Sequence, residues 1–371
     1  MTHPHPRITE LLADGSASSR SDIARLLGIA PSTASAWVGQ LIKAGVVVED
    51  GLVASGSGRP RRKLRLNRPP GHLLVAELGG NHARLGVADR AGRLLRSTTS
   101  PLTVADGPDQ VLRSLTTLLR NQRAEGEPAG VGLALPGPVQ PGGTVRLPSR
   151  MPGWAGFPVQ EALAESFGVP AVVENDANAM ALGEHRTQFG SEGDSITVKA
   201  GTAIGSGIVI AGQLYRGATF AAGDVTHTVV HAAGNRPCTC GKTGCLETVA
   251  SGAGIVARLV EQGIEVTKTA DALALARDGD PEATTMIRTA GSLLGEVLSS
   301  VVSFFNPQAL FLTGGLASSQ HFVTAVRARI YDGCHPLMTE SLRIEAASLG
   351  ADAALAGTAL LTAAAVREAT T

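Results

Sequence analysis

The sequence is short of several residue types on which whole classes of protein depend. Of its 371 residues only four are cysteines and 3% are aromatic, so neither a disulfide framework nor an aromatic core is expected. Its longest uncharged run, Val297 to Val326, is broken by an Asn-Pro and a Gly-Gly pair and cannot form one membrane helix. The opening residues, MTHPHPRITE, lack the apolar stretch of a signal peptide. We therefore expect a cytoplasmic protein with no membrane contact, whose cores are built from Ala, Val, Leu and Ile.

The chain also has no net charge, but its charges are unevenly distributed. Residues 1–70 contain ten Lys or Arg and five Asp or Glu, which leaves 22 basic and 27 acidic groups in the remaining residues. A basic head beside an acidic body is typical of a protein whose head meets nucleic acid. Pro-Pro-Gly at 69–71 indicates a linker. The sequence thus predicts two domains, 1–70 and 71–371.

The basic head has the spacing of a helix-turn-helix. Short helices are predicted over 7–14, 20–27 and 31–44, with a turn at Gly28 and Pro31 at the first position of the third helix. Short polar side chains at the start of that helix can approach base edges and phosphates, and these are Ser32, Thr33 and Ser35.

A wing is predicted to follow the third helix. The run VVVEDGLV reads as a hairpin that turns at Asp50-Gly51. A flexible Gly-rich stretch then supplies cations for a groove or for phosphates, namely Arg59, Arg61 and Arg62. We interpret residues 1–70 as a winged helix-turn-helix. The alternative is a small helical domain with a solvated basic tail.

The body shows the same pattern twice. Alternating apolar residues from 73 predict a β-meander, followed by a helix at 108–122 and further strands. Strands at 195–199 and 206–211, a hairpin at 213–216 and later helices repeat this order. Two such halves predict a duplicated α/β domain with a cleft between them.

Nine short motifs in this body resemble those of the ROK family (repressor, open reading frame, kinase). They are LGG at 78–80, LPGPV at 135–139, PGW at 152–154, VENDANA at 173–179, GTAIGSG at 201–207, YRGA at 215–218, AGDVTH at 222–227, CTCGKTGCLE at 238–247 and NPQALFLTGG at 306–315. The resemblance implies a two-lobed actin-like (ribonuclease-H-like) fold shared by sugar kinases and sugar-responsive repressors. The head resembles the winged helix of the family's repressors.

A metal site is predicted in the loop 227–247. Cys238, Cys240 and Cys245 supply three thiolates within eight residues, and His227 is the expected fourth ligand. Three Cys and one His suit a closed, structural zinc site, and the resemblance assigns zinc to the same four positions. The alternative is a set of unpaired buried cysteines.

The resemblance also implies a sugar site. The residues that it places there are Asn175, Asp176, Asp224, His227 and Glu247, with Asp176 at the position of the general base of family kinases. Arg150 replaces an Asn near the PGW turn, where a guanidinium suits a phosphorylated or carboxylated sugar. A solvent-facing Arg at the rim is the alternative.

The nucleotide half departs from the family's kinases. Glu77 and Asn81 stand where the kinases have Asp and Thr, and Ala203 and Ser206 replace two glycines. We therefore expect a sugar-responsive transcriptional regulator, a dimer or tetramer that binds an inverted-repeat operator. The alternative is a sugar kinase that uses ATP and Mg²⁺ and carries a DNA-binding head; a scaffold with neither activity explains less.

Overall fold

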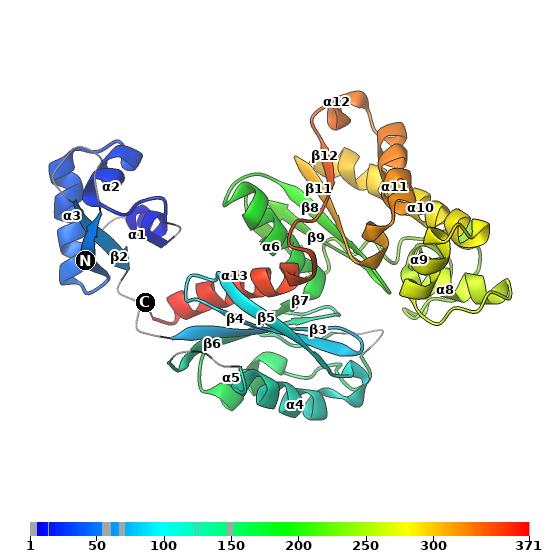
Figure 1. Cartoon of the computed structure of the whole chain (residues 1–371), viewed down its shortest axis with the longest axis horizontal. Coiled ribbons are helices and arrows are strands. Elements are labelled where there is room, and N and C mark those ends of the chain that lie inside the picture. The colour runs from blue at the N-terminus through cyan, green and yellow to red at the C-terminus, as the bar shows by residue number, and fades with distance from the viewer. Residues whose placement is uncertain are drawn as a thin grey trace. The chain divides into compact units, whose positions relative to one another are not determined.

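The computed structural model describes residues 6–13, 15–53, 61–66, 71–122, 124, 126–146 and 151–370. Its contacts divide the chain into an N-terminal unit (Met1–Gly71 with Glu125–Glu127) and a large unit (His72–Ala124 with Pro128–Thr371), each described here by itself (Figure 1). None of the helices in the described ranges has the length and apolarity needed to cross a membrane.

The N-terminal unit consists of three helices and a two-stranded antiparallel sheet: α1 (Pro6–Ala13), α2 (Arg20–Leu27), α3 (Pro31–Lys43), β1 (Val47–Val53) and β2 (Arg61–Leu66). Ser19 caps α2 by accepting a hydrogen bond from the Asp22 amide. Gly28 ends α2 in the left-handed region at φ 63°, which a glycine adopts without strain. The predicted helix-turn-helix is therefore present.

The predicted turn at Asp50-Gly51 is wrong. Strand β1 runs through both residues, and between the pairs Glu49–Leu64 and Leu52–Arg62 two residues of β1 face one residue of β2. This β-bulge is possible because Gly51 takes a φ of 74°. The Arg65 guanidinium donates to Asp50 at 2.8 Å, which keeps that residue in the ladder. Arg61 and Arg62 consequently belong to strand β2 rather than to a flexible loop.

The first half of the large unit is a five-stranded sheet in the order β5-β4-β3-β6-β7 with two helices on one face. Its elements are β3 (His72–Leu78), β4 (His82–Ala88), β5 (Leu94–Pro101), α4 (Pro108–Arg120), β6 (Pro128–Leu135), α5 (Val159–Phe167) and β7 (Ala171–Asn175). In β3, Leu74 and Ala76 pack in the core that includes α4 and α5, whereas Leu73 and Val75 face the opposite side. The β-meander predicted from the sequence is the antiparallel part of this sheet.

The second half repeats this strand order as β10-β9-β8-β11-β12. Its elements are β8 (Ser195–Ala200), β9 (Ile204–Ile210), β10 (Gln213–Tyr215), α7 (Glu247–Ala250), α8 (Gly252–Glu261), α9 (Thr269–Arg277), α10 (Pro281–Phe305), β11 (Ala309–Thr313), α11 (Gln320–Gly333), α12 (Pro336–Thr339) and β12 (Arg343–Ala346). Four short 3₁₀ segments lie between consecutive helices or strands of the large unit: Val104–Asp106, His231–Ala233, Gly315–Ser318 and Gly350–Asp352. The duplicated order confirms the α/β fold class.

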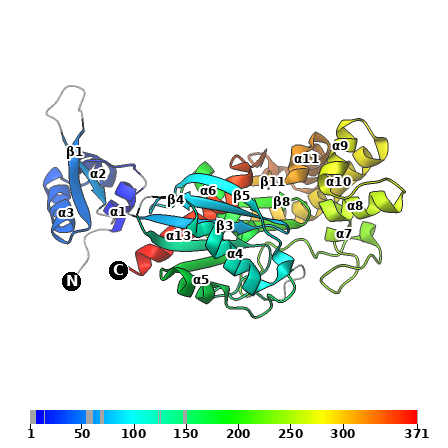
Figure 2. The ribbon, with the colours of Figure 1, turned by 60° about the horizontal axis from the view of Figure 1, so that its bottom comes forward.

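Two helices link the halves. Helix α6 (Asp176–Phe189) follows the first sheet but packs on β8 and β9, whereas α13 (Ala353–Glu368) follows the second sheet but packs on β3 and β6 (Figures 1 and 2). The two helices also pack on each other through glycines. A Cβ on Gly357 would lie 1.8 Å from the Ala179 carbonyl oxygen, and one on Gly183 would lie 2.3 Å from that of Ala353. The halves are therefore interlocked.

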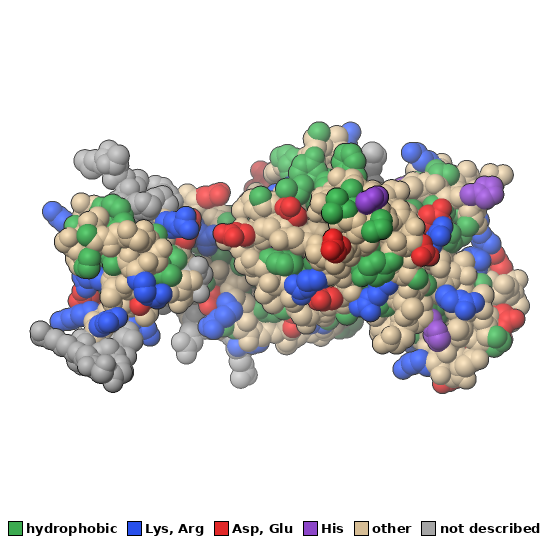
Figure 3. All heavy atoms as spheres, turned by 90° about the horizontal axis from the view of Figure 1, so that it is seen from above, with side chains coloured by type: hydrophobic (Ala, Val, Ile, Leu, Met, Phe, Trp, Pro, Cys, Tyr) green, Lys and Arg blue, Asp and Glu red, His purple; other side chains and the backbone are tan. Residues whose placement is uncertain are grey.

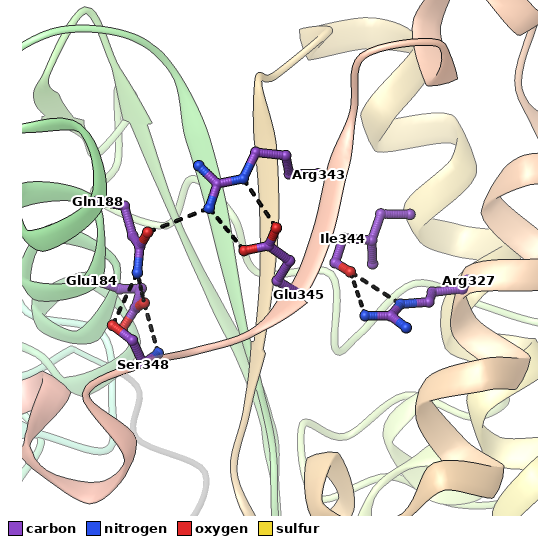
Figure 4. A network of polar contacts seen from close by, with 7 residues as sticks. All are labelled: Glu184, Gln188, Arg327, Arg343, Ile344, Glu345 and Ser348. Carbon is purple, nitrogen blue, oxygen red and sulfur yellow. Dashed lines mark hydrogen bonds and ion pairs between the residues drawn. The ribbon is translucent and has the colours of Figure 1, made fainter.

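A buried carboxylate holds the segment that crosses from the second sheet to α13. Glu184 of α6 is fully buried and accepts hydrogen bonds from the amides of Ser348 at 2.7 Å and Leu349 at 3.1 Å (Figure 4). Gln188, one turn further along α6, joins Glu184 to Arg343 of β12 (Figure 4). These bonds fix where the chain enters α13.

Candidate functional site

Four metal-ligating side chains meet in the loop between β10 and α7. The ligand atoms of His227, Cys238, Cys240 and Cys245 all lie within 4.8 Å of one another. The Cys240 and Cys245 sulfurs are 3.7 Å apart, and the Cys238 sulfur is 3.5 Å from Nδ1 of His227. Burial, together with the neighbouring sulfurs, raises the pKa of Cys245 to about 12, so a thiolate there requires a cation beside it.

These distances fit a tetrahedral ion. With bonds of about 2.3 Å to sulfur and 2.0 Å to nitrogen, a tetrahedron places two sulfurs about 3.8 Å apart and a sulfur and a nitrogen about 3.5 Å apart. The loop is also tightly folded, since the Cys238 amide donates to the Lys242 carbonyl and Gly241 and Gly244 take φ values of 88° and 77°. The residues can therefore hold a metal ion.

The residues expected at the sugar site converge on the start of β9. Glu247 is buried at the beginning of α7, and its Oε2 accepts a hydrogen bond from the Ile204 amide at 3.1 Å. Ala177, the neighbour of Asp176, packs against Gly205 and Gly207. A Cβ added to Gly207 would lie 2.7 Å from the Ala177 carbonyl oxygen. Asp176 and Glu247 thus reach the same strand from different elements.

The segment 222–227 joins them there. The Thr226 hydroxyl donates to the Ile204 carbonyl at 2.7 Å, and the Ser206 hydroxyl donates to the Gly223 carbonyl. Asp224 is exposed between them and accepts a hydrogen bond from the Thr226 amide at 3.2 Å. His227 follows directly and turns Nδ1 to the cysteines, which leaves Nε2 for another partner. The metal loop and this segment are therefore one structure.

Asn175 and Asp176 lie where β7 passes into α6, and both are engaged. Asn175 caps α6 through Oδ1, which accepts from the Asn178 amide, and its Nδ2 donates to the Gly137 carbonyl at 3.0 Å. Asp176 Oδ1 accepts from the Ala177 amide at 2.8 Å. The sequence analysis predicted no helix at this position, so α6 was missed.

Lys199 is the residue at this site that the sequence analysis overlooked. It comes from β8 in the second half, and its ammonium lies 2.7 Å from Oδ2 of Asp176 and 3.9 Å from Oε1 of Glu77, which belongs to β3 of the first half. Burial opposes the charge, but Asp176 and Glu77 raise the pKa of Lys199 above its usual value. A lone lysine inside the apolar strand SITVKA was the signal, because a cation there needs a partner.

A second ion pair joins the halves close by. Arg216, just after β10, binds the buried carboxylate of Glu174 in β7 at 2.7 Å. Glu174 also accepts hydrogen bonds from the Asn175 amide and from Nδ2 of Asn178. The second half thus contributes two cations, and the first half contributes their carboxylates.

The loop that begins at Gly201, which was expected near nucleotide phosphates, is hydrogen-bonded through its carbonyl groups to the start of α8. The Gly252 and Ala253 amides, at the start of α8, donate to the carbonyls of Gly201 at 2.7 Å and Thr202 at 3.0 Å. Amides at a helix N-terminus otherwise attract anions. In this chain the Gly252 and Ala253 amides already donate to these carbonyls rather than to an anion.

The N-terminal unit presents the other predicted contact residues on its surface. Ser32 and Ser35 of α3 are exposed and Thr33 is half-buried, although Ala30 makes no side-chain cap for this helix. A concavity of about 590 Å³ is lined by residues of α2, α3 and β2, among them Ser21, Arg25, Ser35, Arg61 and Arg62. On the face shown in Figure 3, Lys and Arg side chains gather over this unit.

The arginines of β2 are held in place. Arg61 donates to the Ser21 hydroxyl at 2.8 Å, and Arg62 pairs with Glu49 at 3.3 Å. Their guanidinium groups therefore border the concavity in fixed positions. Two other predicted site residues, Arg59 and Arg150, lie outside the described residues.

Comparison with known proteins places the large unit in a family. The sequence profile of the ROK family matches residues 74–365. The chain belongs to the ROK family. A ROK crystal structure titled a family transcriptional regulator and homologue of the E. coli MLC protein superposes with a TM-score of 0.78 over 97% of this chain and 95% of that chain, at 24% identity. This match establishes the shared fold, including the N-terminal unit.

Repressors and kinases are both among the ROK relatives. The xylose repressor of Caldicellulosiruptor bescii is 27% identical over 92% of this chain and 90% of its own length. The glucokinase of Thermotoga maritima is 30% identical over 77% of this chain and 96% of its own length. The repressor alignment extends beyond the large unit, whereas the glucokinase alignment has the extent of that unit.

Proposed function

We propose that this protein is a DNA-binding transcriptional repressor whose large unit binds a sugar or sugar derivative as effector. The main support is that a xylose repressor aligns over 92% of the chain, whereas a glucokinase aligns over 77%. A repressor needs the N-terminal unit, and a kinase does not. The proposal places the protein in the cytoplasm, with its operator.

In this proposal α3 enters the major groove and β2 borders the sugar-phosphate backbone. Ser32, Thr33 and Ser35 face bases or phosphates, while Arg61 and Arg62 supply positive charge next to them. Arg59 takes part as a third cation. Two copies of the chain, alone or within a tetramer, present two such units to an inverted repeat. Neutralised phosphates make binding weaken steeply as salt rises.

The sugar lies at the junction of the two halves, where several fixed oxygen acceptors converge. Asn175, Asp176, Asp224, His227 and Glu247 are the proposed ligands. Arg150 is the proposed contact for a negatively charged group on the sugar. The effector acts if it binds the two states of the protein with different affinity.

The metal in this proposal is a structural zinc ion held by His227, Cys238, Cys240 and Cys245. When bound, it supplies no reactive position, because four protein ligands complete its coordination. The chain's own residues do the rest: His227 directs Nε2 away from the cysteines, and Cys245 holds the start of α7, where Glu247 lies.

A sugar kinase is the second candidate, favoured by 30% identity to a glucokinase. A kinase needs Asp176 free to accept the proton of the attacking hydroxyl, but here Lys199 neutralises it at 2.7 Å. Release of ADP in the presence of ATP, Mg²⁺ and D-glucose, D-xylose or N-acetyl-D-glucosamine tests this. Turnover that is lost in Asp176→Ala would establish the kinase.

The deciding experiment is capture of fragmented genomic DNA by the purified protein, sequenced with and without the same three sugars. Recovery of one inverted repeat, altered by one sugar, supports the repressor. Recovery of DNA without a common sequence, and with only a salt dependence, contradicts it. Ser32→Ala/Ser35→Ala serves as the control, because it should lose the repeat and keep the salt-dependent binding.

A further inference from the structure

The two carboxylates around Lys199 are at unequal distances from its ammonium. Nζ is 2.7 Å from Asp176 and 3.9 Å from Glu77, so a shift of about 1 Å would exchange a hydrogen bond to one for a hydrogen bond to the other. Asp176 and Glu77 are both buried, with side chains 9% and 5% exposed, whereas that of Lys199 is 26% exposed. A flexible lysine chain can make this shift without movement of the backbone.

Both carboxylate oxygens of Asp176 are already hydrogen-bonded, so a sugar hydroxyl would compete with the present donors. Oδ1 accepts from the Ala177 amide at 2.8 Å, and Oδ2 binds Lys199. If a sugar displaced the ammonium of Lys199 and no other carboxylate were near, the ammonium would be left unpaired, which would oppose sugar binding. Glu77 removes that cost, because it offers the ammonium a second carboxylate.

We propose that Lys199 is a movable counter-ion, which passes from Asp176 to Glu77 when a sugar hydroxyl binds Asp176. Glu77 is then a positioning residue for sugar binding, although it does not touch the sugar. This inference rests on the proposed function, in which Asp176 is a sugar ligand. It also gives Lys199 and Glu77 a role that requires no bound nucleotide.

The transfer depends on the charge of Glu77. Burial raises the pKa of Glu77 to about 6, against the attraction of Lys199 and Arg84 and with the repulsion of Asp176 and Asp352. His82, beside Arg84 and Lys199, has a lowered pKa and is neutral at pH 7. Below pH 6 Glu77 takes up a proton and no longer attracts the ammonium. Sugar affinity should therefore rise as pH increases through about 6.

The first experiment needs no sugar and tests whether the ammonium can change partner. Asp176→Asn imitates a carboxylate that a ligand has occupied, and Glu77→Gln removes the second carboxylate. At pH 8 each single variant leaves Lys199 one carboxylate, so each should melt within a few degrees of the wild type. The double variant leaves none and should lose roughly 5 °C more than the sum of the two.

The same cycle in a Lys199→Met background is the control, because without the ammonium the extra loss should vanish. Additive losses in the presence of Lys199 would show that the two carboxylates do not replace each other, which overturns the inference. All variants change one polar or long side chain for another of similar size, and circular dichroism confirms that each is folded.

The second experiment measures the affinity for D-glucose, D-xylose and N-acetyl-D-glucosamine by calorimetry from pH 5 to pH 8. The wild type should bind its sugar about tenfold more tightly at pH 7.5 than at pH 5, since a carboxyl group with a pKa of about 6 is only about one-tenth ionised at pH 5. Glu77→Gln should bind as weakly as the acidic wild type at every pH. Glu296→Gln, which alters an exposed pair with Arg329 at 3.6 Å, should behave as the wild type.

The two experiments separate the possible failures. A wild type that binds none of the three sugars counts against the proposed function, while the stability cycle still decides whether the ammonium moves. A sugar bound with equal affinity and equal pH dependence by wild type and Glu77→Gln would mean that Lys199 and the sugar share Asp176, and the inference falls. A loss of affinity confined to Glu77→Gln supports it.

Discussion

The two halves of the large unit share one strand order but differ in charge at equivalent positions. Glu77 is the residue before last in β3, the first strand of its sheet, and Lys199 is the residue before last in β8, the first strand of the other. These counterparts face each other 3.9 Å apart. Equivalent positions of the two sheets therefore carry opposite charges, which makes their meeting point an attractive contact.

The halves also differ in what they have added. The metal loop at 227–247 and helices α7 to α9 have no counterpart among the described residues of the first half. Two ion pairs between the halves, Asp176 with Lys199 and Glu174 with Arg216, have the carboxylate on the first half and the cation on the second. The pair of Arg84 with Asp352 has the reverse arrangement. A ligand at the junction therefore meets a different chemistry from each side, although the backbones are alike.

Removal of the metal should produce the largest difference in stability between the halves, because all four ligand residues lie in the second half. A ligand in 1,000-fold excess over its Kd contributes about 4 kcal/mol to the free energy of unfolding. We expect a chelator, or Cys245→Ser, to lower the Tm and to speed hydrogen exchange in residues 226–262. Exchange in β3 to β6 should change far less. Equal acceleration in both halves would contradict a local role for the metal loop.

Gly357→Ala should affect both halves together. The new Cβ would lie 1.8 Å from the Ala179 carbonyl oxygen, and overpacking of this kind costs about 1–3 kcal/mol. Denaturant unfolding should show a lower midpoint, with exchange accelerated in α6 and α13 alike. Gly39→Ala in α3 is the control, since this helical glycine has no positive φ and nothing lies within 4 Å of its added Cβ; a loss as large there would argue against the helix contact.

A pH series sharpens the comparison of Glu77 with Lys199. The folded pKa of Glu77 is about 6 against an ordinary value of 4.5, so the folded state holds its proton more tightly than the unfolded state. Stability should therefore fall by about 2 kcal/mol in all as the pH rises from well below 4.5 to well above 6. Glu77→Gln should remove this fall. The free energy of unfolding from urea titrations measures it, and an unchanged slope in the variant would assign the effect to another group.

Ala30→Ser should give the smallest change, and in the N-terminal unit alone. The wild-type helix α3 has no side-chain cap, and a serine there should stabilise it by about 1 kcal/mol. Thermal unfolding monitored by hydrogen exchange should show slower exchange at the start of α3. The exchange rates in the large unit should not change. A decrease in stability would mean that Ala30 packs where a hydroxyl is not tolerated.

Local patterns in the sequence predicted much of this fold. The three head helices, the meander and the repeated strands follow from apolar periodicity and from turn residues such as Gly28. The metal group also follows from spacing, because three cysteines in eight residues with tight glycine turns can reach one ion. Each of these features is encoded within a short stretch of chain.

The remaining features depend on contacts between distant segments. Asp50-Gly51 has the composition of a turn, but strand β1 continues through it as a bulge, with Asp50 paired to Arg65 of β2. Helix α6 was missed because Asn175 and Asp176 suit a turn, and the packing of α6 on the other half was not visible locally. Lys199 is recognisable only when Asp176 and Glu77 are brought to it from the other half.

The position of α13 determines which parts of the protein can fold during synthesis. Leu73 and Val75 lie on a sheet face that α13 covers, yet about 280 residues separate them along the chain. Synthesis at 5–20 residues per second leaves that face uncovered for roughly 15–60 seconds. The N-terminal unit, whose helices and strands all lie between Pro6 and Leu66, can fold while the ribosome is still working. A nascent chain can therefore carry a finished DNA-binding head before it has a body able to sense a ligand.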